Sequence, residues 1–505
     1  MYKRQHEDHI GGIPYLLKEV PIPFIYAPRL AAALIRSKLK DFHLENQVKI
    51  IEVDGSENDQ QKMRGLLKNF KITFFAVNHS IPDSFGINID TPNGKVVTTG
   101  DYKFDWTPLG HNADIDKITK MGQEGVTLLL ADSTNSEIEG YTLTESKIIK
   151  NISDYFLKAK GRIIISTFAS NVHRIQQIIK IAQLFDRKIL VFGRSLDRII
   201  NIIKELGHLK FYEEKSIQSL FIKPTEAEQY KDKPHKILII CTGSQGEPLA
   251  ALSRISLGTH RSVSIIPGDT VIFSSSPIPG NQSNVEMVVN RLSRLGAIVV
   301  ENSSFNSLHT SGHASQEEQK LMLTLLKPRF FMPMHGDYRM LKSHGNTAES
   351  IGIKKEDIFI CSNGDQINLY KHNDKYYAGI GKRVNANPIF VDGKDTSGLT
   401  TRVSRDRQRL SNDGLMAVVA SINTKENKLV CNPTIISRGS FYVKDSSALI
   451  AESINIATRA IKKVLNEPHP SFAAIKREIK ENLSPFIFDK RKRSPVIIPV
   501  ILELL

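Results

Sequence analysis

HEDHIGGIP, at residues 6–14, places His6, Glu7, Asp8 and His9 directly before a glycine pair, near the start of the 505-residue chain. Imidazole and carboxylate groups suit zinc or manganese, and such a dense group of them is unlike a buried core pattern. Asp8 and His9 are neighbours whose side chains point in different directions. They therefore suit a pair of metal ions better than a single one.

Three further candidate ligands follow short apolar runs that end in turn residues, which is the pattern of buried strands. They are His79 in Asn78-His79-Ser80, Asp101 in Gly100-Asp101, and His335 in Met334-His335-Gly336. A lone histidine at a strand end is more often structural, and Gly-Asp is more often a turn. Together with residues 6–9 they favour a site in which an aspartate bridges two cations that activate water for a phosphate displacement.

Between residues 144 and 315 the pattern alternates between strands and helices. Strand-like residues 162–167 precede a helix-like Val172–Leu184, and strand-like residues 188–192 precede a helix-like Arg198–Leu206. This alternation predicts a parallel α/β module. The motifs near His79 and His335 flank this module, and each puts a candidate metal ligand after a strand-like run. We therefore expect both motifs to belong to the first domain and the module to be inserted into it.

A third unit follows a linker rich in Asn, Pro, Asp and Gly. It contains a strand-like segment over residues 415–422, a helix-like Leu449–Leu465 and a β-prone Val496–Leu502. The basic run Asp489–Arg493 is interpreted as a solvated turn. The predicted boundaries are 1–143 and 316–380 for the first domain, 144–315 for the inserted domain, 381–397 for the linker, and 398–505 for the third unit.

Composition limits the class of protein. The formal net charge of +15 favours a polyanionic partner, although a solvated basic surface explains charge alone equally well. Three widely spaced cysteines, Cys241, Cys361 and Cys431, form no disulfide framework and fit a reducing cytoplasm. The longest apolar runs fall well short of the roughly 20 residues that span a bilayer. We therefore expect no membrane partner.

The sequence resembles the metallo-β-lactamase superfamily, its branch with an inserted β-CASP domain, and within that branch the ribonuclease J family. The resemblance covers nearly the whole chain. It depends on residues 6–12, Thr99–Asp105, Ala131–Asn135, Thr242–Pro248, His309–Ser315, Pro333–Arg339, Ile435–Gly439 and Arg493–Pro499. It implies an α/β fold: an αββα sandwich without its opening strands, an inserted Rossmann-like β-CASP domain, and a small C-terminal α/β domain.

The resemblance also implies roles for individual residues. His6 and His79 would hold one zinc ion, Asp8, His9 and His335 the other, and Asp101 would bridge the two, with Mn²⁺ or Mg²⁺ as alternative metals. Asp8 and His313 would be catalytic, with His313 beside the scissile phosphate. Asp132 would not bind metal itself but would orient the residues that do. Ser244, His309, Ser311, Gly312 and His313 would bind RNA and its 5′-phosphate. The alternative interpretation of His313 is a structural histidine in a polar loop. The alternative interpretation of the 5′-phosphate pocket is a pair of tight turns that bind no ligand.

The function that the resemblance implies is a zinc-dependent ribonuclease that cuts single-stranded RNA from the 5′ end and internally, in mRNA decay and rRNA maturation. It would act in the cytoplasm as a homodimer or homotetramer, or with a paralogous subunit. Two alternatives remain open. One is a catalytically impaired RNA-binding subunit of the same family, and the other is a small-molecule metallo-hydrolase, which has no need of the long insert.

The sequence departs from the family signature His-x-His-x-Asp-His at its first position. Arg4 stands where the family has a histidine, and the strands that precede the signature are absent, so we expect a truncated N-terminus.

Arg4 generates a prediction about metal content. Its permanent positive charge opposes a nearby cation, so the zinc ion held by His6 and His79 should lack a ligand. We expect weak or single-metal occupancy, measured by elemental analysis of the purified chain. Two zinc ions per chain together with full activity would contradict this.

Overall fold

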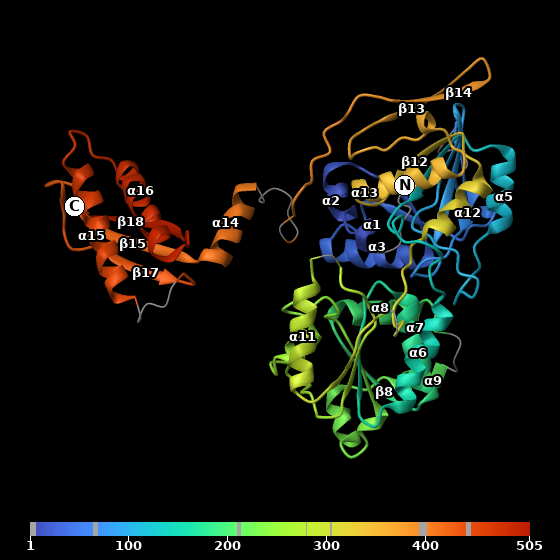
Figure 1. Cartoon of the computed structure of the whole chain (residues 1–505), viewed down its shortest axis with the longest axis horizontal. Coiled ribbons are helices and arrows are strands. Elements are labelled where there is room, and N and C mark those ends of the chain that lie inside the picture. Colours follow the sequence, from blue (N-terminus) through green and yellow to red (C-terminus); the bar gives the residue numbers. More distant parts are fainter. Residues whose placement is uncertain are drawn as a thin grey trace. The chain divides into compact units, whose positions relative to one another are not determined.

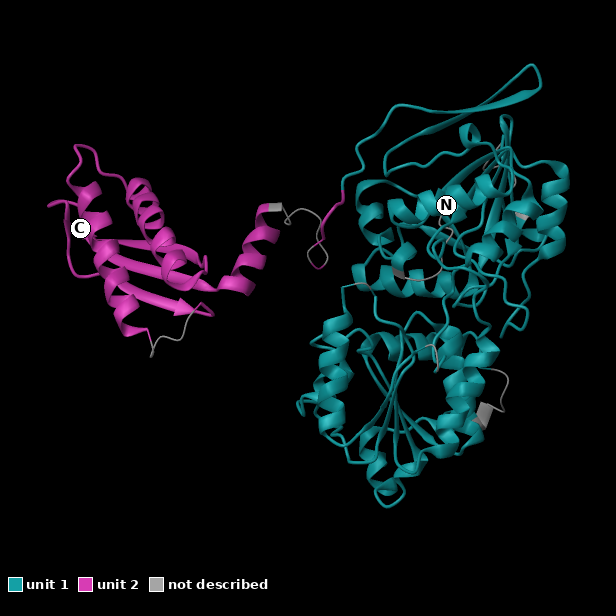
Figure 2. Ribbon diagram, in the orientation of Figure 1, with its two compact units in different colours: residues 1–387 teal, residues 388–505 magenta. Residues whose placement is uncertain are grey.

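The computed structural model describes residues 7–63, 69–209, 214–278, 280–303, 306–391, 393, 401–440 and 446–504. The chain forms two compact units, Met1–Asn387 and Pro388–Leu505, which are coloured separately in Figure 2. Each unit has its own hydrophobic core. Among the described helices, none is both long enough and apolar enough to cross a membrane.

A five-stranded sheet forms the centre of the first domain, with strand order β12-β6-β5-β4-β3. Its strands are β3 (Lys71–Ala76), β4 (Phe85–Thr91), β5 (Gly94–Thr98), β6 (Leu128–Asp132) and β12 (Phe330–Met334). β5, β6 and β12 are parallel, and β4 is antiparallel to both β3 and β5. The carboxyl ends of β3, β5, β6 and β12 therefore meet at one edge of the sheet.

A second, parallel sheet of β1 (Phe24–Pro28) and β2 (Lys49–Val53) packs against the first. Tyr26 and Val53 of this pair share an apolar cluster with Phe74 and Ile87 of the larger sheet. Helices cover the outer faces. They are α1 (Glu7–Ile10), α2 (Ile13–Glu19) and α3 (Arg29–Phe42) on one side, and α5 (Ile115–Glu124), α12 (Gln316–Leu326) and α13 (Tyr338–Ser350) on the other. The predicted αββα sandwich is confirmed.

The inserted domain contains a wholly parallel sheet in the order β11-β10-β7-β9-β8, visible below the first domain in Figure 1. Its strands are β7 (Ile163–Ser166), β8 (Lys188–Phe192), β9 (Ile237–Cys241), β10 (Thr270–Phe273) and β11 (Ile298–Val300). Alternate strand residues pack on α6 (Glu145–Lys158), α7 (Val172–Leu184), α8 (Arg194–Glu205) and α9 (Glu214–Leu220) on one face, and on α10 (Ala251–Ser256) and α11 (Gln282–Arg294) on the other. The Rossmann-like arrangement is confirmed, although α8 begins four residues before the predicted Arg198.

The C-terminal unit is a sheet covered on one face by two long helices. Its elements are α14 (Thr401–Asp413), β15 (Leu415–Asn423), β16 (Lys428–Leu429), β17 (Thr434–Arg438), α15 (Ser447–Leu465), α16 (Phe472–Arg491) and β18 (Val496–Leu504). Every second residue of β15, from Met416 to Ile422, is buried against α15 and α16. This alternation is what a strand with one face covered requires.

A hairpin of β13 (Ile367–His372) and β14 (Lys375–Ile380) ends the first unit.

A fully buried ion pair lies where the inserted domain joins the first domain. The guanidinium of Arg174, on α7, has no exposed surface and donates to Glu145 Oε2 at 2.9 Å, at the start of α6. It also donates to Ser274 Oγ and to the backbone oxygen of Leu308. Burial alone raises a carboxyl pKa, but the charge of Arg174 outweighs it, so the pKa of Glu145 lies below its ordinary value. Arg174 therefore joins Glu145, near the start of the inserted domain, to Leu308, near its end.

This pair leads to a stability prediction. Arg174→Ala leaves Glu145 as an uncompensated buried charge, so the free energy of unfolding should fall by about 3 to 5 kcal/mol in denaturant titrations. Arg198 pairs with Asp41 with about half of each side chain exposed. Arg198→Ala is the matched control and should change the free energy of unfolding by less than about 1 kcal/mol. Equal effects of the two variants would show that burial of the Arg174 pair is unimportant.

Candidate metal centre

Four candidate residues lie at the shared carboxyl edge of the larger sheet. His79 follows β3, Asp101 follows β5, Asp132 is the last residue of β6, and His335 follows β12. His335 has a φ of 59°, in the left-handed region, which ends the strand abruptly. Residues far apart in the chain are thus brought together because their strands run in one direction.

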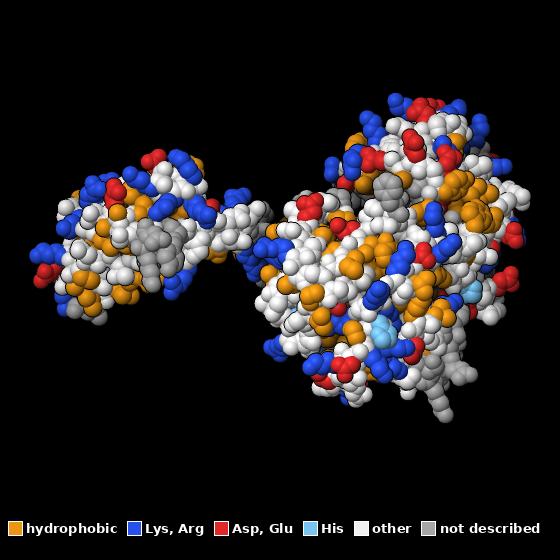
Figure 3. Space-filling view, turned by 60° about the horizontal axis from the view of Figure 1, so that its bottom comes forward, with side chains coloured by type: hydrophobic (Ala, Val, Ile, Leu, Met, Phe, Trp, Pro, Cys, Tyr) orange, Lys and Arg blue, Asp and Glu red, His pale blue; other side chains and the backbone are white. Residues whose placement is uncertain are grey.

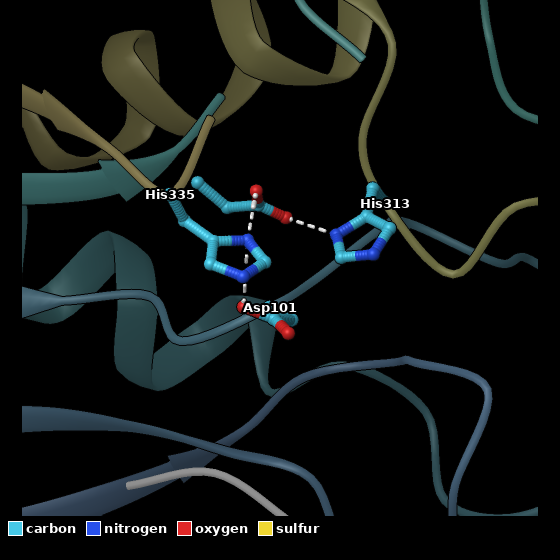
Figure 4. A group of neighbouring side chains, drawn as sticks. Asp101, His313 and His335 are labelled. Carbon is cyan, nitrogen blue, oxygen red and sulfur yellow. Dashed lines mark hydrogen bonds and ion pairs between the residues drawn. The ribbon is translucent and has the colours of Figure 1, made fainter. Parts of the chain in front are cut away.

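Asp101, Asp132, His313 and His335 form a compact group of possible metal ligands. One ligand atom from each lies within 4.8 Å of all the others. Both carboxylates are buried, and the histidines are partly exposed. Figure 4 shows Asp101, His313 and His335 pointing toward one another from three separate segments. The group therefore combines buried charge with access from one side.

Asp132 connects the two histidines. Its Oδ2 accepts a hydrogen bond from His313 Nδ1 at 2.6 Å, and its Oδ1 lies 3.2 Å from His335 Nδ1. Burial disfavours the ionised carboxylate, but the charge of His313 and the hydrogen bonds from both rings outweigh it. The pKa of Asp132 is therefore held well below its ordinary value. Asp132 is an anion at the centre of the group.

His9 and His79 border this group. His9 Nε2 lies 2.7 Å from Asp101 Oδ2, and its ring centroid is 5.0 Å from that of His335. The His79 ring centroid is 5.1 Å from that of His313. Asp8 is an exposed residue of α1, adjacent to His9. The structure thus brings together His9, from the motif at residues 6–9, and the strand-end candidates His79, Asp101 and His335.

The donor set fits a divalent metal of the zinc or manganese type. Imidazole nitrogens and carboxylate oxygens are ligands that these ions accept, and buried aspartates supply the negative charge that offsets the cation. Within the described residues, the group that could hold an ion is Asp101, Asp132, His313 and His335, with His9 beside Asp101 and His79 beside His313. His6 and Arg4 lie outside the described residues, so the predicted role of His6 stays a prediction.

The segment of residues 308–315 carries His313 into the site. Gly312 O accepts a hydrogen bond from His79 Nδ1 at 2.8 Å, and Ser311 Oγ accepts one from the backbone N–H of His313 at 3.2 Å. Asn135 and Thr142 both donate to His313 O. A Cβ on Gly312 would lie 2.5 Å from His79 Nδ1, closer than real Cβ contacts. Only glycine lets this segment approach His79 so closely.

The other predicted phosphate-binding residues lie at the carboxyl edge of the inserted sheet. Ser244 is buried in the loop after β9, and His309 follows β11. The loops are connected: Gln245 donates to Ser276 O at 3.0 Å, and Asn302 donates to Ser276 Oγ at 3.0 Å and accepts from the backbone N–H of His309. Burial, and then the charge of Arg174, lower the pKa of His309 to about 4. His309 is therefore neutral at pH 7.

Two supporting residues, Thr134 and Glu318, were absent from the predicted site residues. Thr134 Oγ1 lies 3.0 Å from His335 Nδ1, and the buried Glu318 accepts from the backbone N–H groups of Phe104, Thr142 and Ser315. Glu318 had a readable signal, because Ser315 and Glu318 have the spacing of a helix capping box, which α12 forms. Thr134 had no such signal.

Comparison with known proteins agrees with this geometry. Family models match residues 160–292 as the ribonuclease J β-CASP domain, 302–360 as the zinc-dependent metallo-hydrolase RNA specificity domain, and 403–504 as the ribonuclease J C-terminal domain. Ribonuclease J 1 of Streptococcus pyogenes is 44% identical over 98% of this chain and 85% of its own length. The chain belongs to the ribonuclease J family.

Other members of the ribonuclease J family are similar over the same extent. Ribonuclease J of Mycoplasma genitalium is 40% identical, covering 98% of this chain and 85% of its own length. Ribonuclease J2 of Bacillus subtilis is 38% identical, covering 99% of this chain and 86% of its own length. As a member of this family the chain is a metal-dependent nuclease that binds RNA, and its group of His and Asp side chains could hold a metal ion.

The close approach of Gly312 to His79 yields a prediction. Gly312→Ala should displace His79, lower zinc affinity at least tenfold in a competition titration with a chelating dye, and lower RNA cleavage in parallel. Gly379, on β14, has nothing within 4 Å of an added Cβ, so Gly379→Ala is the matched control. Unchanged zinc affinity in Gly312→Ala would show that His79 and residues 311–313 do not depend on each other.

Proposed function

We propose that this chain is a zinc-dependent ribonuclease that removes nucleotides from the 5′ end of single-stranded RNA and also cuts RNA internally. The convergence of Asp101, Asp132, His313 and His335 within 4.8 Å carries this proposal. Membership in the ribonuclease J family supplies the substrate class. The basic composition of the chain, with a net charge of +15, suits a polyanion.

His9, Asp101 and His335, with Asp8, would hold one zinc ion, and His6 and His79 with Asp101 the other. Bound zinc ions activate water and stabilise the charge that develops on the attacking and leaving oxygens. Asp101 contacts both histidines that would hold the first ion: its Oδ2 lies 2.7 Å from His9, and its Oδ1 lies 3.4 Å from His335. Its bridging role is what the family resemblance implies. Mn²⁺ and Mg²⁺ remain alternatives.

His313 would act on the leaving oxygen. Its Nδ1 donates to Asp132 at 2.6 Å, which fixes the ring orientation and leaves Nε2 to carry the proton that is delivered to the RNA. An ionised, buried Asp132 also stabilises the protonated ring. Asp132 would therefore act as a positioning residue, and His313 as the general acid.

A pocket that binds the 5′-monophosphate would explain why nucleotides are removed from the 5′ end of the RNA. Ser244, His309, Ser311 and Gly312 offer hydroxyl, imidazole and backbone N–H donors. The Nδ1 of His309 is buried, and among the described residues it has no hydrogen-bond partner. A buried polar atom without a partner costs roughly 1–3 kcal/mol, which a phosphate oxygen at this position would recover.

The cellular role that fits this chemistry is mRNA decay and rRNA maturation in the cytoplasm. The enzyme would act as a homodimer or homotetramer, or with a paralogous subunit.

The 5′-end preference is the test of this function. With added zinc or manganese, the chain should degrade 5′-monophosphorylated RNA to mononucleotides, resolved on a sequencing gel, and a chelator should stop the reaction. A 5′-triphosphate should slow release of mononucleotides at least tenfold, because it does not fit a monophosphate pocket, while internal cuts continue.

His313→Ala, with zinc content checked, is the control for contaminating nucleases and should abolish both kinds of cleavage. RNA binding without turnover in either metal would instead indicate an impaired RNA-binding subunit. Equal rates of mononucleotide release from 5′-monophosphorylated and 5′-triphosphorylated RNA would refute the phosphate pocket.

A further inference from the structure

Two basic segments of the C-terminal unit lie side by side. The first is α14, and the second is Asp489–Arg493, at the end of α16. Arg493 Nη1 donates to Asn412 O at 3.2 Å across 81 residues, and Arg409 Nη2 lies 3.5 Å from Ser494 O across 85 residues. The two segments therefore form one continuous region, here named the basic surface.

The basic surface carries far more positive than negative charge. Eight cationic and three acidic side chains belong to it. The cations are Arg402, Arg405, Arg407, Arg409, Lys490, Arg491, Lys492 and Arg493, and the acids are Asp406, Asp413 and Asp489. All eight cations are exposed. In Figure 3, several groups of Lys and Arg side chains lie on the visible face of the C-terminal unit, with fewer Asp and Glu side chains beside them.

The packing of the unit does not explain α14. Residues 404–412 are all exposed, so the helix buries no apolar stripe. A 13-residue helix is marginal in water without packing, and clustered arginines repel one another. Cations near the end of α16 do favour its helix dipole, but α14 has no such role for its arginines. A bound polyanion would offset the repulsion and stabilise the helix.

An exposed aromatic ring within the basic surface indicates the kind of polyanion. Phe488 is 52% exposed, and Lys492 Nζ lies 5.6 Å from its ring centroid. Cations that follow a phosphate backbone, beside an aromatic ring on which a base stacks, are typical of single-stranded nucleic-acid binding. An acidic protein would use the cations but has no bases to stack on the ring.

We propose that the basic surface of the C-terminal unit is a second RNA-binding site, separate from the metal centre, which holds the phosphates of single-stranded RNA with Phe488 against a base. The RNA identity of the ligand rests on the proposed function. RNA binding at this surface would not depend on the RNA sequence, because the cations contact phosphates and any base can stack on the Phe488 ring. An RNA long enough to contact both the metal centre and the basic surface binds more tightly than a short one, since the second contact becomes intramolecular.

The test measures RNA binding by the full chain in a chelator, so that cleavage plays no part. Arg402→Gln, Arg405→Gln, Lys490→Gln and Lys492→Gln are combined, which leaves Arg409 and Arg493 to join the segments. The Kd for a 40-nucleotide uridine-rich RNA should rise about tenfold. The slope of log affinity against log salt should fall by about 3, given roughly 0.7 per phosphate contact on single strands. Cleavage of a 6-nucleotide RNA with metal should stay within twofold.

A matched variant removes the same charge elsewhere on the unit: Lys425→Gln, Lys428→Gln, Lys462→Gln and Lys476→Gln, all at exposed positions. Its salt slope should equal that of the parent chain, and an equal loss would overturn the proposal. Phe488→Leu should weaken RNA binding at least threefold without changing the salt slope.

Binding of poly-L-glutamate, measured in the same variants, distinguishes an acidic protein partner from RNA. Loss of its binding in the four-site variant, with RNA binding unchanged, would assign the surface to a protein and overturn the proposal. Normal binding with no cleavage in metal would contradict only the proposed nuclease activity. Thermal melting within about 2 °C of the parent chain verifies that the variants fold.

Discussion

The buried carboxylate of Asp132 ties together the segments from which the metal centre is built. It ends β6, accepts a hydrogen bond from His313 on the segment that returns from the inserted domain, and contacts His335 after β12. A buried charge is tolerated only while its partners stay in place. Displacement of either histidine therefore removes part of the compensation of this anion, so the strand ends and the returning segment depend on one another.

The inserted domain leaves and re-enters the first domain at neighbouring points. Thr310 Oγ1 donates to Leu143 O at 2.8 Å, and Thr142 Oγ1 donates to His313 O at 2.8 Å, so the outgoing and returning chains are joined beside the site. The buried Arg174 adds a bond to Leu308 O on the returning chain. The insertion thus holds His313 from one side while the sheet holds Asp132 from the other.

Strand ends were the predictable part of this molecule. His79, Asp101 and His335 follow apolar runs broken by turn residues, so the sequence pattern places each of them at the end of a strand. Their meeting at one edge of the mixed sheet depends on the strand directions, which the structure supplies. Arg174 and Glu145 were not predictable, since charged residues in a helical pattern are normally solvated, and only the tertiary fold buries this pair. The first turn of α8 was missed for a similar reason: its residues 194–197 are mostly polar, and only Leu196 packs inward.

Residues 312 and 313 carry two constraints in consecutive positions. Gly312 must lack a side chain because its backbone contacts His79, and His313 must keep the orientation in which it donates to Asp132. A shift of this segment would move a proposed metal ligand and the proposed acid together. In the proposed mechanism, metal binding and proton delivery would be coupled through one short stretch of backbone, in which the His313 carbonyl accepts hydrogen bonds from Asn135 and Thr142. The precision of the centre thus depends on hydrogen bonds to the backbone as much as on the ligands.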